Sequence, residues 1–580
     1  MVPVKVAGEL VEELLNEDLV EYRADHMTLE ELEHLSVETK FYNIVLNKLM
    51  TRGAKVIVGP RGVGKTHHMR LAYKQCIEKK TKPLPVYVSF SKYLRLEPLR
   101  SSSSIAIQYF HCWVLSKILL AVKDTLSYQN VYEDEVLKSD VTWADLELFC
   151  EQIEKQQTRE WHSKLLDYLS VNVVIEFTDK AIELCKRKSA VILCDDAALV
   201  LTKDYMIEFF DIFRSLKTAR ISPKASVYPS TEFGPRFHIG QDAEPVPCWP
   251  SIEDSEYQAL YKTIYDKRFD FDLKEEVKMC FAYASFGVPR AFINLINRYQ
   301  MLSGKSEQNK VNTIIREQAQ LLIDEYMSLS IKQPQFSKYV VAGKQIINQV
   351  SKLVSKDNAE KLKQNKQQYI LGISQDGLKS KSDQKKIDTI VKLLEEIGLI
   401  HKLAPVRHGR NADDSPRVYD RYIPHYTLLL NDGALQIGSS GYITTFLNSI
   451  SKPKAQPFRK KSFVDFYDKN SFSELSLDLP DCSTCGNARA TEDQRFCMYC
   501  GSELVNPSMY RILINTKVEE LPITAWLKER IKSETNIETI GDIALSNNSG
   551  QELMKARGIG KIKATKVIDH AKDWMEEYLS

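Results

Sequence analysis

A chain of 580 residues is too long for one hydrophobic core, so the sequence predicts three to five domains. With 43% hydrophobic and 27% charged residues, the composition is that of a globular protein and excludes a disordered chain. The net charge of +2 excludes a polycation, so any nucleic-acid binding has to come from local basic patches.

The N-terminus, the most apolar stretch and the single cysteines predict a cytoplasmic protein without a membrane span. The first residues lack the cationic flank and apolar run of a signal peptide. The most apolar stretch, from Ile105 to Val122, is interrupted by polar side chains such as His111 and Lys117, which favours a buried helix over a membrane span. Seven cysteines stand singly, as expected of reduced buried thiols. These are Cys76, Cys112, Cys150, Cys185, Cys194, Cys248 and Cys280.

Short apolar runs alternate with helical patterns over the first 250 residues. Strands are expected at residues 54–59, 86–90 and 189–196, and this alternation predicts a parallel, doubly wound α/β sheet. The expected domains begin with a helical segment at 1–52, an α/β core at 53–248 with a helical insertion at about 100–188, and a helical lid at 249–330. A helix-and-strand domain at 331–430 and a linker at 431–478 are expected next. The chain is then expected to form a cysteine-containing domain at 479–504 and a helical domain at 505–580.

A glycine-rich loop follows the first expected strand and precedes a helix. Glycines allow the backbone N–H groups to wrap a phosphate, Lys65 can reach the terminal phosphates, and Thr66 can bind Mg²⁺. Strand, loop and helix occur in the order that a P-loop requires, so the sequence predicts an ATP and Mg²⁺ site here. The expected nucleotide-binding residues are Gly59, Pro60, Arg61, Gly62, Val63, Gly64, Lys65, Thr66 and His67.

Two carboxylates end a buried strand about 130 residues further on. Asp195 is expected to hold Mg²⁺ through water, and Asp196 to orient or deprotonate the attacking water. The alternative is that the pair caps a helix after a core strand.

These motifs, together with Gly287-Val288-Pro289-Arg290, resemble AAA+ ATPases of the origin-recognition or initiator type and the related STAND NTPases. The resemblance covers roughly residues 35–430. It implies that Arg290 contacts the γ-phosphate, unless Arg290 is only a surface arginine. Many relatives have Asp-Glu where this chain has Asp195-Asp196, and the shorter carboxylate predicts slow hydrolysis.

The resemblance also implies two residues that the motifs do not identify by themselves. A sensor residue is expected at Ser230 or Thr231, after the strand that begins at Ala225. Arg236 is expected either to act as an arginine finger on a neighbouring subunit or to be an ordinary loop arginine.

Residues 385–426 resemble a winged helix, with a helix that ends at Gly398 and two strands around a basic loop. Origin-type ATPases carry such a domain directly after the lid. The wing would present Arg407, His408, Arg410, Arg417 and Arg421 to DNA phosphates, although winged helices also pack against proteins.

Four cysteines are paired near the C-terminus. Cys482 and Cys485 form one Cys-x-x-Cys pair, and Cys497 and Cys500 form a second pair eleven residues later. Four thiolates at this spacing can close a tetrahedral Zn²⁺ site, and the glycine after each pair permits a tight turn. The sequence predicts a structural zinc ribbon, because no ligand position is left open.

The tail resembles a helix-hairpin-helix domain and, as a whole, the C-terminal domain of the RNA polymerase alpha subunit. Its hairpin contains Gly558 and Gly560, whose backbone N–H groups would face a DNA phosphate, and the helix after it carries Lys561 and Lys563. Such a domain can instead dock a protein.

The leading hypothesis is an ATP-switched AAA+ protein that binds duplex DNA and forms a homo-oligomer with ATP bound. The alternative is a STAND-like sensor, for example in bacterial defence, whose C-terminal domains recognise a protein or foreign nucleic acid. A third reading is a scaffold that binds nucleotide for stability alone. An effector or nuclease protein could act as a partner, because the sequence itself contains no recognisable nuclease motif.

Overall fold

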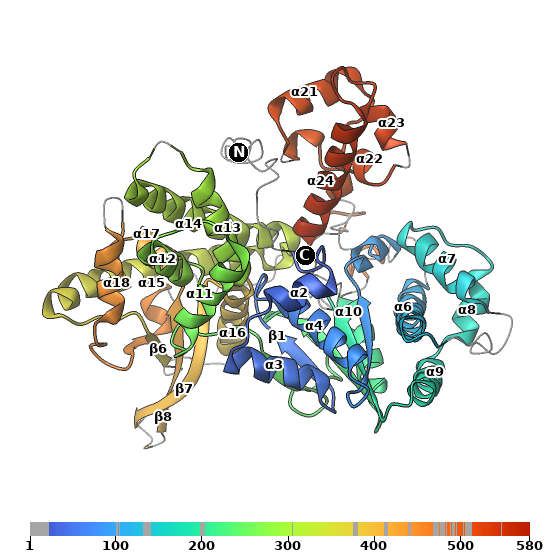
Figure 1. The fold of residues 1–580 in the computed structure, drawn as a ribbon, viewed down its shortest axis with the longest axis horizontal. Coiled ribbons are helices and arrows are strands. Elements are labelled where there is room, and N and C mark those ends of the chain that lie inside the picture. The colour runs from blue at the N-terminus through green and yellow to red at the C-terminus, as the bar shows by residue number, and fades with distance from the viewer. Residues whose placement is uncertain are drawn as a thin grey trace.

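The computed structural model describes residues 23–99, 105–131, 141–197, 203–303, 305–374, 381–410, 416–438, 442–467 and 513–579 except 522 and 547, together with residues 103, 414 and 475 and parts of 482–504. Residues 1–22 of the expected N-terminal segment therefore lie outside the described residues. Figure 1 shows the α/β core in the middle, with the helices of the insertion on one side and the lid on the other.

A five-stranded parallel sheet forms the first layer of the core. Its strands are β1 (Lys55–Val58), β2 (Leu84–Ser89), β3 (Ala190–Asp195), β4 (Ile221–Val227) and β5 (Glu244–Pro247), in the order β2-β3-β4-β1-β5. The prediction of a parallel sheet is confirmed. Sequence patterns did not indicate β5, because two prolines interrupt it; prolines are tolerated at the edge of a sheet, where β5 lies.

Helices cover both faces of this sheet. On β3, Val191 and Leu193 belong to one hydrophobic core, whereas Ile192 and Cys194 belong to the other, as expected for a strand whose alternate side chains point to opposite faces. The helices around the sheet are α2 (Leu29–Leu35), α3 (Lys40–Met50), α4 (Lys65–Glu78), α10 (Lys203–Ser215) and, in the insertion, η1 (Tyr93–Leu96), α6 (Ala106–Tyr128), α7 (Trp143–Glu154), α8 (His162–Tyr168) and α9 (Val171–Leu184).

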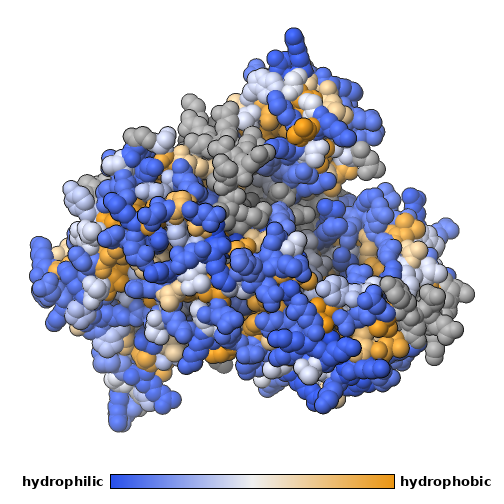
Figure 2. All heavy atoms as spheres, in the orientation of Figure 1, coloured by the Kyte–Doolittle hydropathy of each residue, from blue (hydrophilic) through white to orange (hydrophobic). Residues whose placement is uncertain are grey.

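The apolar stretch that begins near Ile105 is helix α6, whose side chains pack into the insertion's core. Within the described part of the chain, no helix is both long enough and apolar enough to cross a membrane. Hydrophilic side chains predominate on the face drawn in Figure 2, where hydrophobic ones occur in small scattered groups.

A helical lid follows the core. It consists of α11 (Tyr257–Arg268), α12 (Glu275–Ala284), α13 (Pro289–Met301) and α14 (Glu307–Lys332), followed by η2 (Pro334–Phe336), α15 (Ser337–Lys361) and η3 (Leu362–Gln364). Helix α13 begins with Pro289 at its first position, where a missing N–H costs nothing.

A second, four-stranded sheet follows the lid in the order β7-β8-β6-β9. Its elements are β6 (Leu371–Ser374), α16 (Lys381–Glu396), β7 (Ile400–Arg410), β8 (Pro416–Pro424), α17 (Tyr426–Asn431), α18 (Ile443–Ser451), β9 (Arg459–Ser462) and η4 (Phe463–Asp465). The antiparallel β7–β8 hairpin extends away from the body of the protein (Figure 1). The hairpin follows α16 directly, as the winged-helix resemblance implies.

The prediction of a linker at 431–478 is wrong for the described residues of this segment. This segment forms α18 and β9, and β9 pairs in parallel with β6 from Leu371 to Ser374. Proline and lysine in this stretch suggested a linker, but Phe446 and Phe458 are buried and tie the segment into the core. The four-stranded sheet therefore depends on chain far beyond the predicted boundary at 430.

The C-terminal helices form a group of their own at the top of Figure 1. They are η5 (Val518–Glu520), α21 (Ala525–Glu534), α22 (Ile540–Ala544), α23 (Ser549–Leu553) and α24 (Lys561–Leu579). The turn between α23 and α24 contains Gly558, whose φ of 89° and contact with Trp526 leave no room for a side chain.

Candidate functional site

The phosphate loop connects β1 to the N-terminus of α4. Gly62 and Gly64 have φ angles of 79° and 93°, which glycine adopts without strain. A side chain on Gly62 would also meet Arg290 and Val288 at 3.0 Å, because the lid packs directly on the loop. The strand, loop and helix therefore occur as the motif predicts, and two of its glycines are required by geometry.

A cavity of about 660 Å³ opens over this loop. Residues 61–68 line it, together with parts of α2, α3, α11 and α13. Gly59 and Pro60 are not part of the wall, but their carbonyl groups accept hydrogen bonds from the Lys65 ammonium at 2.7 and 2.9 Å. Within the predicted loop, residues 61–67 thus face the cavity, whereas Gly59 and Pro60 hold the Lys65 ammonium.

Lys65 is buried beneath the loop. Besides its two hydrogen bonds, its ammonium lies 4.2 Å from the centre of the Tyr228 ring. Burial lowers the pKa of Lys65 to about 8, against the opposing effect of nearby thiol and carboxyl groups. The side chain is therefore held by carbonyl oxygens and an aromatic face, all of which a phosphate can replace.

Asp195 and Asp196 end β3 in different environments. Asp195 is 1% exposed, and its carboxylate accepts hydrogen bonds from Ser226 Oγ and the Asp196 N–H on Oδ1, and from the Tyr87 hydroxyl on Oδ2, at 2.9–3.1 Å. Asp196 has a φ of 52°, and its side chain lines the cavity. Burial, and then the charge of Asp195, raise the pKa of Asp196 to about 8. The pair is thus one enclosed carboxylate and one that faces the cavity.

The turn after β4 places Tyr228, rather than Ser230 or Thr231, in the cavity wall. The Tyr228 N–H donates to Thr231 Oγ1 at 3.1 Å, and the Thr231 N–H donates back to the Tyr228 carbonyl at 3.1 Å. Thr231 therefore closes the turn. Sequence reasoning missed Tyr228 because it considered only the small hydroxyl side chains of Ser230 and Thr231 after this strand.

The two candidate arginines lie in different surroundings. Arg290 lines the cavity at the start of α13, and its backbone nitrogen lies 3.4 Å from the Gly62 carbonyl oxygen. The side chain of Arg236 is 72% exposed and forms an ion pair with Asp211 at 3.2 Å, away from the cavity. Arg290 is therefore part of the cavity wall, whereas Arg236 is not.

An apolar part of the cavity wall was not apparent from the sequence. Helices α2, α3, α11 and α13 contribute to it, together with the segment between α2 and α3. The side chains are Leu35, Val37, Tyr42, Leu46, Ile264 and Ile293. The N-terminal segment is fastened here by Ser36, whose hydroxyl lies 2.9 Å from His67 Nε2, and by Lys267, which donates to the Ser36 carbonyl. Such a wall suits the flat, apolar faces of a nucleobase.

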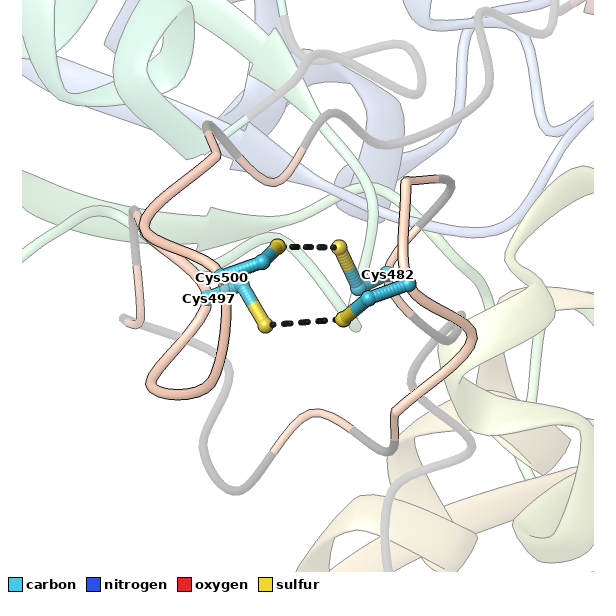
Figure 3. A group of neighbouring side chains, drawn as sticks. Cys482, Cys497 and Cys500 are labelled. Atoms are coloured by element: carbon cyan, nitrogen blue, oxygen red, sulfur yellow. Dashed lines mark hydrogen bonds between the residues drawn. The ribbon is translucent and has the colours of Figure 1, made fainter.

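The four paired cysteines meet in one cluster. Their Sγ atoms all lie within 4.8 Å of one another, and Figure 3 shows Cys482 facing Cys497 and Cys500 of the second pair. The Sγ–Sγ distances of 3.5 Å for Cys482–Cys500 and for Cys485–Cys497 are too long for disulfides and close to the ~3.8 Å between thiolates on one tetrahedral zinc ion.

The backbone around both pairs has the same hydrogen-bond pattern. Gly486 N–H donates to the Cys482 carbonyl at 2.8 Å, and Gly501 N–H donates to the Cys497 carbonyl at 2.9 Å. Both glycines have positive φ, of 69° and 71°. Two matching turns thus present four thiols to one point, and this donor set fits a metal ion.

The predicted DNA-contacting residues lie on two exposed features. On the β7–β8 hairpin, Arg407 and Arg410 are exposed and Arg417 is half-buried, while Arg410 pairs with Asp414 at 2.6 Å. In the C-terminal hairpin, Gly560 and Lys561 are exposed, and Lys563 Nζ donates to the Gly558 carbonyl at 3.2 Å. The structure does not bring these two features together with the nucleotide cavity.

The sheet order, the phosphate loop and the acidic end of β3 define a P-loop ATPase of the AAA+ class. Residues 19–223, about a third of the chain, match the ORC-CDC6-like family model. This part of the chain is therefore similar to the ORC-CDC6-like family.

Three solved structures align with most of this chain at low identity. A Walker-type ATPase of Pyrococcus abyssi is 11% identical, with a TM-score of 0.35, over 75% of this chain and 99% of that one. The Aeropyrum pernix ORC1 protein in complex with DNA is 11% identical, with a TM-score of 0.30, over 70% and 95%. The Aeropyrum pernix ORC2 protein is 12% identical, with a TM-score of 0.28, over 74% and 98%. No curated protein sequence matches this chain significantly.

Proposed function

We propose that this protein is an ATP-switched AAA+ ATPase that acts on duplex DNA. The observation that carries the proposal is a cavity that combines Lys65, Asp196 and Arg290 with an apolar wall, in a chain that also carries a projecting cationic hairpin. The cavity accounts for ATP, and the hairpin accounts for DNA.

In the cavity, Lys65 and Arg290 neutralise the terminal phosphates, and the loop amides bind them. Mg²⁺ would be held by Thr66 and, through water, by Asp195, where it would neutralise charge on the phosphate oxygens. Asp196 faces the cavity and accepts the proton of the attacking water. Its backbone has a φ of 52°, and its backbone N–H donates to Asp195 Oδ1 and Ser226 Oγ, which fixes the backbone from which this carboxylate extends.

ATP binding would assemble a homo-oligomer in this proposal. Arg236 is the candidate for completing a neighbour's site, because its exposed side chain lies away from its own cavity. ATP would then be contacted by residues of two subunits: the cavity residues of one subunit and Arg236 of its neighbour.

Duplex DNA would be bound by the β7–β8 hairpin and the C-terminal hairpin. With a net charge of only +2, the attraction has to be local. Arg407, Arg410 and Arg417 supply it on the first hairpin, and Lys561 and Lys563 beside exposed backbone supply it on the second.

Removing the three hairpin arginines tests this function. We expect the Arg407→Ala, Arg410→Ala, Arg417→Ala variant to bind a random duplex at least ~10-fold more weakly, with a salt slope shallower by up to about three, because each lost phosphate contact releases about one counterion fewer. Fluorescence anisotropy across a salt series measures both quantities.

A matched variant removes the same charge elsewhere. Lys79, Lys80 and Lys188 are exposed at the far ends of α4 and the α9–β3 turn, and their replacement by alanine should leave the salt slope unchanged. Equal losses in both triple variants would mean that binding reflects total charge only. A wild-type protein that binds no duplex would refute the proposed function.

We further propose that the four-cysteine cluster holds one structural Zn²⁺. The donor set and the paired glycine turns support this, and four thiolates leave no position for substrate. Metal analysis of the purified protein should give about one zinc per chain, and Cys485→Ser with Cys500→Ser should abolish it. The variant Cys76→Ser, which alters a single buried cysteine in α4, should keep its zinc; zinc lost from both variants would contradict the assignment.

A further inference from the structure

Two adjacent histidines near the start of α4 line the nucleotide cavity. The Nε2 atom of His67 lies 2.9 Å from the hydroxyl of Ser36, whose two sequence neighbours belong to the apolar wall. The His68 ring lies 4.6 Å, centre to centre, from the ring of Tyr42, another residue of that wall. Both imidazoles therefore border the part of the cavity that suits a nucleobase.

The hydrogen bonds of Ser36 determine which nitrogen of His67 carries a hydrogen. The Ser36 hydroxyl has one hydrogen and donates it to the Leu32 carbonyl at 2.6 Å, because a carbonyl can only accept. Its oxygen therefore accepts from His67, and Nε2 carries the hydrogen. Burial lowers the pKa of His67 to about 3, so the ring is neutral at physiological pH. In a neutral ring of this tautomer, Nδ1 has a lone pair and is an acceptor.

Ser36 itself is fixed from three sides. Its hydroxyl bonds to α2 through Leu32 and to α4 through His67. Its backbone is held by α11 of the lid, where Lys267 donates to the carbonyls of His34 and Ser36 at 2.8 and 2.5 Å. The hydroxyl is therefore a fixed acceptor that keeps His67 in one tautomer.

The neighbouring ring of His68 has no hydrogen to offer a base. Its Nδ1 lies 2.8 Å from the Gly64 carbonyl, so this nitrogen carries the hydrogen and donates it to the phosphate loop. The His68 side chain is 6% exposed, and burial lowers its pKa, which leaves the ring neutral and Nε2 without a hydrogen. Both rings therefore have a single remaining nitrogen that is an acceptor.

These two acceptors have no donor of their own. Among the described residues, nothing donates to His67 Nδ1 or to His68 Nε2. A base that fills the cavity displaces water from the wall, and a buried acceptor left without a donor is unfavourable. The base that binds here is therefore one that supplies hydrogens.

The purine 6-position distinguishes the possible bases. Adenine carries an amine there, whose hydrogens are donors, whereas guanine and hypoxanthine carry a carbonyl oxygen, which is an acceptor. An amine next to His67 Nδ1 forms a hydrogen bond, but a carbonyl oxygen in the same place brings two lone pairs together. The fixed tautomer therefore favours adenine.

We propose that His67 selects adenine by accepting a hydrogen bond from its 6-amino group, and that Ser36 is a positioning residue that fixes the tautomer of His67. The inference names the base recognised at the nucleotide cavity and rests on the proposed function only in that the cavity binds a nucleoside triphosphate. It requires neither hydrolysis nor DNA.

Three triphosphates that differ at the purine 6-position test the proposal on the full chain. They are ATP with an amine, purine riboside triphosphate with a hydrogen atom and inosine triphosphate with an oxygen. Calorimetric titration in the presence of Mg²⁺ measures their affinities. Wild type should bind ATP at least ~10-fold more tightly than purine riboside triphosphate, and inosine triphosphate no more tightly than the latter, because each analogue leaves a buried acceptor unpaired.

Variants of His67 and Ser36 identify the group responsible. His67→Phe keeps a flat ring without a lone pair, and should bind ATP and purine riboside triphosphate within about twofold of each other. Ser36→Ala frees the tautomer and should reduce the wild-type ratio, whereas Ser36→Thr, which keeps the hydroxyl, should retain it. His238→Phe replaces an exposed histidine outside the cavity and should also retain it. A ratio between two nucleotides does not change when a variant only lowers stability.

Two results would overturn the inference. One is a wild-type protein that binds the three triphosphates equally, and the other is a wild-type ratio that persists in both His67→Phe and Ser36→Ala. A protein that selects ATP through His67 but binds no duplex DNA would refute the proposed function and leave this inference intact. A protein that binds duplex DNA under the control of nucleotide, without distinguishing the three triphosphates, would refute the inference alone.

Discussion

Replacing Lys65 with alanine is expected to abolish ATP turnover, with a fall of at least ~100-fold, and to weaken nucleotide binding severely. Lys65 is the only cation of the predicted phosphate loop that lies at the N-terminus of α4, where the terminal phosphates bind. Its positive charge acts in a buried site, where electrostatic stabilisation of the transferred phosphoryl group is large. Steady-state turnover and titration with a fluorescent ATP analogue measure the two effects.

The control for this variant is a lysine that directly follows the same helix and does not face the cavity. Lys79 is exposed directly after the end of α4, and Lys79→Ala should turn over ATP as wild type does. Lys65→Ala also leaves the Gly59 and Pro60 carbonyls without their donor, so thermal unfolding should be recorded beside turnover. Wild-type turnover by a folded Lys65→Ala protein would show that ATP is hydrolysed elsewhere.

The second large effect is expected for Asp196→Asn, which should lose turnover by about 100-fold or more and still bind ATP. Asparagine preserves the shape of the side chain but cannot accept the proton of the attacking water. Removing a negative charge next to the phosphates should leave nucleotide affinity equal or higher. Turnover and nucleotide titration together separate this outcome from a collapsed cavity, which would lose both.

The same variant has a pH signature in the nucleotide-free protein. The pKa of Asp196 is raised to about 8, above the value of about 3.9 in an unfolded chain. Between these values the folded state binds the extra proton, so this residue makes wild type less stable as pH rises from about 4 to about 8. Asp196→Asn should avoid that loss, and its advantage in melting temperature should be largest at pH 8 and above.

An exposed aspartate provides the comparison. Asp272 lies on the surface of the lid, and Asp272→Asn makes the same replacement outside the cavity. If Asp196→Asn gained nothing between pH 5 and 8, the pKa of Asp196 would not be raised in the empty cavity, and this pH signature would be refuted.

Local patterns were sufficient for the parts of the site that are contiguous in the chain. The strand, glycine loop and helix around Lys65 could be predicted because three neighbouring elements carry the whole motif. The thiol cluster could be predicted because a Cys-x-x-Cys turn places two sulfurs together through its own backbone. Asp195 and Asp196 stood out because the buried strand β3 is an uninterrupted apolar run that ends in charge.

Contacts between distant segments could not be predicted in the same way. Tyr228 contacts Lys65 across 163 positions of chain, and nothing in the local pattern marks its ring as a partner for a cation. Strand β9 looked like a linker because lysine and proline are typical of loops, yet its pairing with β6 and the burial of Phe458 outweigh that local preference.

By itself, the sequence determined that this protein has a phosphate loop, an acidic strand end and a four-thiol cluster, because each is a short pattern whose geometry the local backbone supplies. Only the tertiary structure decided what surrounds them: the apolar wall drawn from α2, α3, α11 and α13, the burial that raises the pKa of Asp196, and the contact of Lys65 with the Tyr228 ring. These depend on which elements the core brings side by side, because burial and long-range contact are properties of packing rather than of neighbouring residues.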